Sequence, residues 1–285
     1  MLTTRHGRRH CGCLLIRRSQ IALSKQTFTR KTSSATSSPE SSDNIVHVDD
    51  LFSTANRERC VEALKHTESA RPVSVLKQVD TEEISTKYAV LVPLLRVNDK
   101  PSILFTKRSN QLVKHRGEVS FPGGNVDDDR GESLLSAALR EAHEEIGLQP
   151  SSVDIWGRMK PSLTSRLDTS VVPFIGQLDD SITPLDLVPH CDEVELIFTR
   201  SIESLCRPQN VVHTQFRVNL GRASRGKLTS DGQKSTSAFR FRSYSLPVFL
   251  GGRYRIWGLS AVILHQVLLV LAPHLYKPTL TNVRF

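Results

Sequence analysis

The residues with the clearest chemical meaning are three glutamates within five positions, Glu141, Glu144 and Glu145. They fall in a stretch expected to be helical, and helix geometry brings residues three and four apart onto one face. Carboxylates this close repel one another unless a cation lies among them, and hard cations such as Mg²⁺ prefer oxygen ligands. The spacing therefore predicts the carboxylate ligands of a metal site, in which a phosphate group remains to be supplied by the substrate. The alternative for this cluster alone is a solvated acidic helix face.

The surroundings of the three glutamates favour a site. Gly123 and Gly124 precede the helix in a Phe-Pro-Gly-Gly turn, where backbone can approach a ligand closely. Glu132 lies eight residues before Arg140, and we expect an ion pair between them that braces the helix. Gly147 follows the last carboxylate and predicts the end of the helix.

The segment from Glu132 to Leu148, which contains the run REAHEEIGL, resembles the Nudix box of the Nudix hydrolases. Those enzymes cleave a diphosphate that is linked to a further group. A second set of residues resembles the signature of the coenzyme A diphosphatase branch of that family, namely Leu104 to Ser109, His115, Gly117 and Phe121 to Gly124. The resemblance extends over about residues 85 to 275.

This resemblance implies an α/β protein with the Nudix fold, an α/β/α sandwich with a mixed central sheet. It implies hydrolysis of coenzyme A and acyl-coenzyme A to 3′,5′-ADP and (acyl-)4′-phosphopantetheine, with Mg²⁺ or Mn²⁺ held by Glu141, Glu144 and Glu145. The candidate catalytic residues are Glu132, Arg140, Glu141, Glu144 and Glu145. The candidate substrate-binding residues are Arg108, His115, Arg116, Gly123 and Gly124. Nudix enzymes often use one more carboxylate outside the box, and Glu193 is the candidate here.

Two departures from the family pattern keep other substrates open. Seven residues separate Gly124 from Glu132, more than in the usual box, and Val113 stands where the branch signature has Arg. Hydrolysis of another nucleoside diphosphate derivative, such as ADP-ribose or NADH, is therefore the alternative activity. A nucleotide-binding Nudix module without catalysis is a further alternative, although none of the box carboxylates is missing here.

The positive charge is concentrated at the N-terminus. The net charge is +9, but residues 1–39 hold eight Lys or Arg and no acid, which leaves 30 basic and 29 acidic residues in the rest. A nucleic-acid-binding body is therefore not indicated. The Arg-rich, Ser/Thr-rich and acid-poor composition of residues 1–42 predicts a mitochondrial transit peptide with a disordered linker. The expected location is the mitochondrial matrix, with peroxisomal or cytoplasmic location as the alternative.

The remaining chain is expected to form one catalytic domain with appendages, acting on a small molecule as a monomer or dimer. We predict an N-terminal helix and connector over residues 43–86, the Nudix domain over 87–276 with a basic loop at about 216–242, and a tail over 277–285. Within them, the expected helices are 50–66 and 259–272, and the expected strands are 88–97, 103–107, 153–158 and 194–198.

Several smaller features complete these expectations. Asp49 or Asp50 is expected to cap the first helix. The apolar helix 259–272 is shorter than the roughly 20 residues that a membrane span needs, so it is predicted to be a core helix. Trp257, just before it, is expected in the core, and adenine stacking is its alternative role. The basic loop 216–242 is a weaker candidate for binding the 3′-phosphate of coenzyme A.

Overall fold

The computed structural model describes residues 48–65, 85–163, 169–222 and 239–278, all within one compact unit, Val46–Phe285. The predicted transit peptide and linker (1–42) lie outside the described residues. So do residues 66–84 of the predicted connector, residues 223–238 of the basic loop and nearly all of the predicted tail (279–285).

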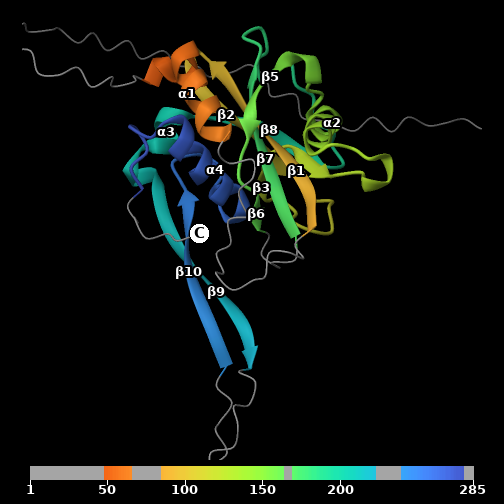
Figure 1. The fold of residues 1–285 in the computed structure, drawn as a ribbon, viewed down its shortest axis with the longest axis vertical. Helices are drawn as coiled ribbons and strands as arrows, with labels where there is room; N and C mark the ends of the chain where they lie inside the picture. Colours follow the sequence, from red (N-terminus) through yellow and green to blue (C-terminus); the bar gives the residue numbers. More distant parts are fainter. Residues whose placement is uncertain (1–47, 66–84, 164–168, 223–238, 279–285) are drawn as a thin grey trace, which may run out of the picture. The chain divides into compact units, whose positions relative to one another are not determined.

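A mixed eight-stranded sheet forms the centre of the fold (Figure 1). Its backbone order is β3-β2-β1-β7-β5, with β4 paired to β1, β6 to β7 and β8 to β2. β1 and β7 pair in parallel, whereas the other neighbours are antiparallel. The strands are β1 (Ser85–Val97), β2 (Lys100–Arg108), β3 (Val119–Ser120), β4 (Gly123–Asn125), β5 (Val153–Arg158), β6 (Ser162–Leu163), β7 (Thr169–Leu178) and β8 (Val194–Ser201). The expected strands within 88–97, 103–107, 153–158 and 194–198 are thus confirmed.

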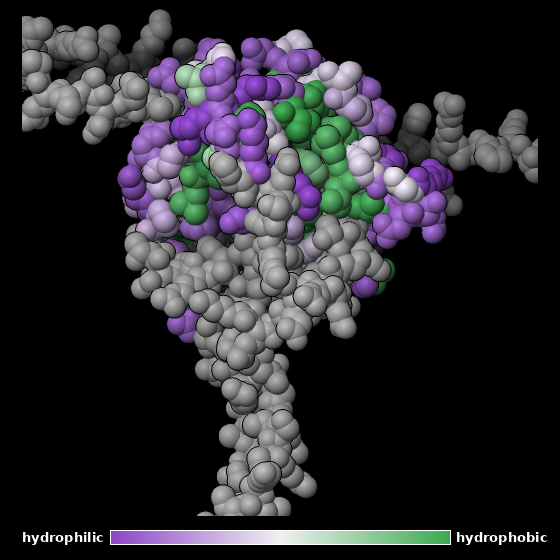
Figure 2. Space-filling view, in the orientation of Figure 1, coloured by the Kyte–Doolittle hydropathy of each residue, from purple (hydrophilic) through white to green (hydrophobic). Residues whose placement is uncertain are grey.

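Helices cover both faces of this sheet. They are α1 (Thr54–Lys65), α2 (Leu134–Ile146), α3 (Ile202–Cys206) and α4 (Gly258–Leu271). Short 3₁₀ turns lie at Val48–Phe52, Asp128–Arg130, Pro150–Ser152 and Pro208–Asn210. In the orientation of Figure 1, Figure 2 shows hydrophobic residues gathered over the region of the central sheet, with hydrophilic residues around them.

Strand β1 supplies apolar side chains to both layers, because successive side chains of a strand point to opposite faces. Val92 and Leu94 pack in the core cluster that contains α1, α3 and α4. Ala89 and Leu91 pack in the second cluster, which contains α2. The predicted α/β/α sandwich with a mixed sheet is therefore confirmed.

The start of the first helix was predicted too early. Val48–Phe52 is a 3₁₀ turn, and α1 begins only at Thr54. The capping group is the hydroxyl of Ser53, whose Oγ accepts a hydrogen bond from the Asn56 amide at 3.3 Å. The prediction that Asp49 or Asp50 caps this helix is therefore wrong, because both lie within the 3₁₀ turn and Ser53 directly precedes the helix.

The prediction of a loop over residues 216–242 was wrong at both of its ends. β9 (Val211–Arg222) and β10 (Phe239–Phe249) form a two-stranded antiparallel sheet, so 216–222 and 239–242 are strand. The sequence of β10 alternates aromatic residues with basic or polar ones, as in Phe239-Arg240-Phe241-Arg242. That period of two favours a strand, and the high charge of the segment concealed it.

Trp257 does not lie in the core. Its side chain is 43% exposed, and the Arg255 guanidinium lies 5.3 Å from the centre of its ring. The following helix α4 is buried over most of its length, as predicted. None of the helices seen in the described residues has the length and apolar character that crossing a bilayer requires.

The buried histidine of α4 predicts acid sensitivity. His265 is 4% exposed and its Nδ1 lies 2.7 Å from the Tyr276 hydroxyl. Burial, with a smaller contribution from His213, lowers the pKa of His265 from 6.5 to about 4. Between these values the unfolded chain binds a proton that the folded chain does not, so stability falls as the pH falls through this window.

We therefore expect the free energy of unfolding to drop by about 1–2 kcal/mol more in wild type than in His265→Gln between pH 7 and pH 5. Urea denaturation at both pH values measures the two changes. Equal losses in the two proteins would contradict this role of His265.

Candidate active site

Helix α2 carries the three glutamates, and both of its ends are fixed. Ser133 caps the start, where its Oγ accepts a hydrogen bond from the Ser136 amide at 3.1 Å. Gly147 ends the helix in the left-handed conformation with φ 73°, and its amide donates to the His143 carbonyl at 2.9 Å. The predicted end of the helix at Gly147 is therefore confirmed. The face of α2 toward the sheet consists mainly of small side chains, Ala137, Ala138 and Ala142.

These small residues let the helix lie close to residues 121–124, where the chain bends at Pro122 and enters β4 at Gly123; we call this segment the glycine turn. Gly123 in β4 has φ 150°, and a Cβ there would collide with the backbone of Ala89 and Val90 in β1. A Cβ on Gly124 would collide with the carboxylate of Glu141. The amide of Gly123 donates to Oε2 of Glu145 at 3.2 Å. The turn therefore brings bare backbone against two of the three helix carboxylates.

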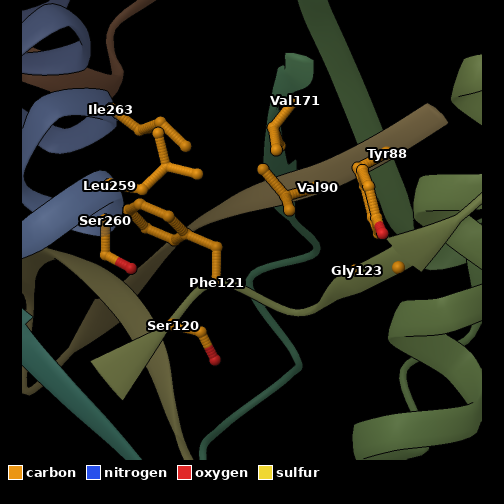
Figure 3. Close-up of a pocket in the computed structure, with 10 residues that line it drawn as sticks. Tyr88, Val90, Ser120, Phe121, Gly123, Val171, Leu259, Ser260 and Ile263 are labelled. Carbon is orange, nitrogen blue, oxygen red and sulfur yellow. The ribbon is translucent and has the colours of Figure 1, made fainter. Parts of the chain in front are cut away.

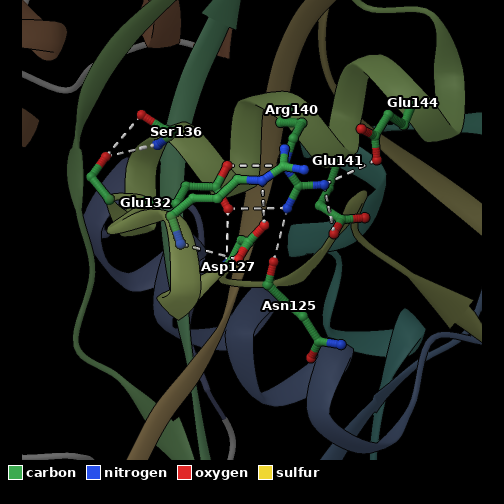
Figure 4. Close-up of polar contacts among 9 residues, drawn as sticks. Asn125, Asp127, Glu132, Ser136, Arg140, Glu141 and Glu144 are labelled. Atoms are coloured by element: carbon green, nitrogen blue, oxygen red, sulfur yellow. Dashed lines mark hydrogen bonds and ion pairs between the residues drawn. The ribbon is translucent and has the colours of Figure 1, made fainter.

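Arg140 joins the loop before the helix to the helix itself (Figure 4). Its Nε and Nη2 donate to the two oxygens of Glu132 at 2.9 and 3.1 Å. The hydrogen bond from Arg140 holds the pKa of Glu132 below its usual range, and the amide of Asp127 also donates to that carboxylate. Nη2 of Arg140 also donates to the Asn125 carbonyl at 3.0 Å. The predicted ion pair between Glu132 and Arg140 is thus present.

The same guanidinium also engages two of the predicted metal ligands. Nη1 of Arg140 donates to Glu141 Oε1 at 3.1 Å and to Glu144 Oε2 at 3.0 Å. Glu144 is the more exposed of the two, with a side chain 55% accessible against 17% for Glu141. Arg140 therefore neutralises both carboxylates from the side of the helix that faces Glu132.

Glu145 is the buried carboxylate of the cluster, with 3% of its surface exposed. Burial raises its pKa to about 7, although the Gly123 amide and the charge of Arg108 act in the opposite direction. Nη1 of Arg108, at the end of β2, lies 3.8 Å from Glu145 Oε1. The negative charges of Glu141 and Glu193 raise the pKa of Glu145 further.

Glu193 belongs to the same electrostatic environment. Its charge raises the pKa of both Glu141 and Glu145, although in each case burial is the larger cause. The backbone carbonyl of Glu193 accepts a hydrogen bond from the Ser109 amide at 2.8 Å. The segment is tied to α2 as well, because the His190 amide donates to the Glu145 carbonyl at 2.8 Å.

The donor chemistry of this cluster suits a divalent cation. All of its candidate ligands are carboxylate oxygens, which Mg²⁺ and similar hard ions prefer. Across the described residues, no group of three or more His, Cys, Asp or Glu side chains is already arranged to hold an ion. The three carboxylates do not converge on one point, because Glu141 and Glu144 accept hydrogen bonds from Arg140 whereas Glu145 accepts one from the Gly123 amide.

The predicted substrate-binding residues divide into two groups. Gly123, Gly124 and Arg108 lie against the carboxylates of α2, as described above. His115 and Arg116 are exposed on the loop between β2 and β3. His115 has φ 55° and its Nδ1 lies 3.0 Å from Oε2 of Glu118, so it pairs within its own loop.

Sequence reasoning missed an apolar cavity beside the glycine turn (Figure 3). Its volume is about 120 Å³. The lining residues are Tyr88, Val90, Ser120, Phe121, Gly123, Gly124, Val171, Leu259, Ser260 and Ile263. They come from four separate parts of the chain, so no local pattern identifies them. The one available signal was the spacing of Leu259 and Ile263, which places them on one face of α4.

Comparison with known proteins agrees with this geometry. Residues 85–213 match the NUDIX domain model. The chain is 38% identical over 199 residues to Nudix hydrolase 3 of Caenorhabditis elegans, covering 70% of this chain and 79% of that protein. It is 35% identical over 238 residues to the mouse mitochondrial coenzyme A diphosphatase NUDT8, covering 81% of this chain and 95% of that protein.

A solved MutT/nudix family protein from Enterococcus faecalis is a more distant structural neighbour. It shares 15% identity and a TM-score of 0.39, over 77% of this chain and 80% of that chain. The Nudix domain match and the extensive identity to curated Nudix enzymes show that this chain belongs to the Nudix hydrolase family.

Proposed function

We propose that the protein is a metal-dependent diphosphatase that hydrolyses coenzyme A and acyl-coenzyme A to 3′,5′-ADP and (acyl-)4′-phosphopantetheine. The observation that carries the proposal is the contact of Glu141 and Glu145 with the Gly123–Gly124 turn. Bare backbone next to paired carboxylates leaves space for a diphosphate and a cation. The identity to the mouse enzyme named mitochondrial coenzyme A diphosphatase supports the choice of substrate.

The proposed cation is Mg²⁺ or Mn²⁺, with Glu141, Glu144 and Glu145 as its ligands. A bound divalent ion offsets charge on the phosphoryl group and lowers the pKa of a coordinated water. To hold such an ion, Glu141 and Glu144 would have to give up their hydrogen bonds to Arg140. The two bonds from Arg140 to Glu132 would still tie the loop to the helix.

Arg108 is the proposed first contact for the diphosphate. Its side chain is 28% exposed, and its Nε is buried without a hydrogen-bond partner among the described residues. A guanidinium with free donors suits a phosphate oxygen, because Arg presents its N–H groups as a rigid fork. His115 and Arg116 on the adjacent loop are proposed to extend this cationic surface.

Glu193 is the proposed proton acceptor for the attacking water. It lies within the charge environment of Glu141 and Glu145, and it is exposed. A general base has to reach the water it deprotonates, and an exposed carboxylate at the rim of the cluster satisfies that requirement.

We propose the mitochondrial matrix as the location, on the composition of residues 1–42 and on the name of the mouse relative.

A substrate panel tests the function. We expect the wild-type protein with Mg²⁺ or Mn²⁺ to convert coenzyme A to 3′,5′-ADP and 4′-phosphopantetheine, with lower kcat/KM on ADP-ribose and NADH.

Glu144→Gln and Glu145→Gln should each lower kcat by about a hundredfold or more, a loss typical of removing one electrostatic contact in an active site. Product analysis by mass spectrometry and unfolding temperatures measure both effects.

Glu62→Gln serves as the control in this panel, because Glu62 is an exposed helix acid that pairs with Lys65 on α1. Near-normal rates in both glutamine variants would refute the ligand assignment. A preference for ADP-ribose or NADH over coenzyme A would refute the substrate.

The contact between Gly124 and Glu141 gives a second prediction. Gly124→Ala places a methyl group where the Glu141 carboxylate now lies, so that carboxylate must move. We expect kcat/KM to fall by about tenfold to a hundredfold, because small misplacements in an active site are costly. Gly131→Asn is the control, since space around Gly131 is open and Asn tolerates its φ of 62°. Equal activity in the two variants would argue against a role for this contact.

The proposed location is tested by deletion. Removing residues 1–39 eliminates eight positive charges and the predicted targeting signal. We expect the truncated protein to keep its activity in vitro and to lose mitochondrial import in cells, as shown by fluorescence microscopy of a C-terminal fusion. Unchanged mitochondrial localisation of the truncated protein would refute the transit peptide.

A further inference from the structure

The apolar cavity described above shares a wall with the candidate active site. Gly123 and Gly124 line the cavity, and the same two residues contact Glu145 and Glu141. Figure 3 shows the cavity residues of α4 on one side and Tyr88 and Gly123 on the other. A group that fills this cavity while a diphosphate lies at the carboxylates must be attached very near the diphosphate.

The walls of the cavity are apolar and well supported. Val90 of β1, Val171 of β7 and two side chains of α4, Leu259 and Ile263, supply aliphatic surface. Phe121 is 3% exposed, and its ring centre lies 5.0 Å from that of Phe105, which fixes it as a wall. Such a surface stabilises an aliphatic group through the area that the group removes from water.

The two serines of the lining already have hydrogen-bond partners. Ser260 Oγ donates to the Val119 carbonyl at 2.8 Å, a bond that also anchors the start of α4 to β3. Ser120 Oγ lies 2.9 Å from Thr106 Oγ1. A ribose or a base would lose its hydrogen bonds to water on entering, and burying unpaired polar groups is costly. The remaining polar side-chain group of the lining is the hydroxyl of Tyr88, a residue that is 36% exposed, so most of the lining favours an apolar group.

Coenzyme A carries one such group beside its diphosphate. On the nucleotide side the diphosphate is attached to a ribose, which is polar. On the pantetheine side it is attached through one CH₂ group to a carbon that bears two methyl groups. A cavity of about 120 Å³ is close in size to engineered apolar cavities of about 150 Å³ that bind benzene, so it accommodates this branched group.

We propose that this cavity, defined by Val90, Phe121, Val171, Leu259 and Ile263, binds the dimethyl carbon of the pantoate part of coenzyme A. The proposal rests on the proposed function and specifies how the site orients its substrate. The pantetheine side of the diphosphate lies toward α4, and the nucleotide side lies away from it. ADP-ribose and NADH have a ribose on both sides of the diphosphate, so the cavity discriminates against them.

Filling the cavity tests this assignment. Leu259→Trp places an indole in the space of the dimethyl group, and Val90→Thr adds a hydroxyl with little change in shape. We expect each to raise the KM for coenzyme A and the Kd of 4′-phosphopantetheine, by about tenfold or more for Leu259→Trp, a size typical of pocket contacts. The Kd of 3′,5′-ADP should not change, because that product lacks the pantoate group.

Leu269→Trp is the matched control, since Leu269 lies on the same helix, is 41% exposed and does not line the cavity. We expect wild-type values of the KM and of both Kd values in this variant. Calorimetry with the two products, and steady-state kinetics with coenzyme A and with a long-chain acyl-coenzyme A, give all the readouts. Unfolding temperatures establish whether Leu259→Trp is folded, and Val90→Thr decides the question if it is not.

Three outcomes would overturn the assignment. If a folded variant binds both products equally more weakly, or binds both as wild type does, the cavity is not a pantoate site. Wild-type turnover of coenzyme A would leave the proposed function intact in that case. A loss confined to long-chain acyl-coenzyme A would mean that the cavity binds the acyl chain. A wild-type protein that does not hydrolyse coenzyme A would refute the proposed function and this inference together.

Discussion

The close approach of helix α2 to the Gly123–Gly124 turn is the constraint on which the site depends. Any side chain at Gly123 would collide with β1, and any side chain at Gly124 would collide with Glu141. The helix can approach because Ala137, Ala138 and Ala142 form its inner face. Buried carboxylates are costly unless they are bonded, and here backbone amide and guanidinium groups supply the bonds. The geometry of the turn therefore determines where negative charge accumulates.

Arg140 links the loop, the turn and the helix into one unit. Its bonds to Glu132 and to the Asn125 carbonyl hold the loop that follows β4, and its third nitrogen contacts Glu141 and Glu144. A single cation thus offsets repulsion among carboxylates that helix geometry brings together. Glu145 lies outside this set, and its raised pKa reflects burial beside further negative charge. The cluster therefore combines two carboxylates paired with Arg140 and one whose ionised form is disfavoured by burial.

The glycine turn also separates two environments of opposite chemistry. On one side are carboxylates and Arg108, which suit a charged diphosphate and a metal ion. On the other side are the aliphatic side chains of β1, β7 and α4. A substrate in which a diphosphate adjoins an apolar branched carbon matches both sides at once. In the proposed assignment, fold and substrate choice are connected, because the α4 layer that completes the sandwich also forms the apolar wall.

The sequence by itself indicated the family, the fold class and the main helices. The spacing of Glu141, Glu144 and Glu145, the position of Gly147 and the pair Glu132–Arg140 are local features, and helix periodicity is enough to interpret them. Four strands of the central sheet, β1, β2, β5 and β8, followed from their apolar runs, whereas β3, β4, β6 and β7 were not predicted. The strands β9 and β10 were missed because charge obscured their alternation, and Trp257 was misplaced because an aromatic residue beside an apolar helix resembles core.

Only the tertiary structure decided which distant residues meet. The ion pair of Arg108 with Glu145, the close approach of Gly124 to Glu141, and the cavity that α4 and the turn line together all join segments that lie far apart in the chain. Such contacts depend on the order of strands in the sheet and on which face each helix covers. Local sequence periodicity carries no information about either, so the apolar cavity became visible only when the layers were assembled.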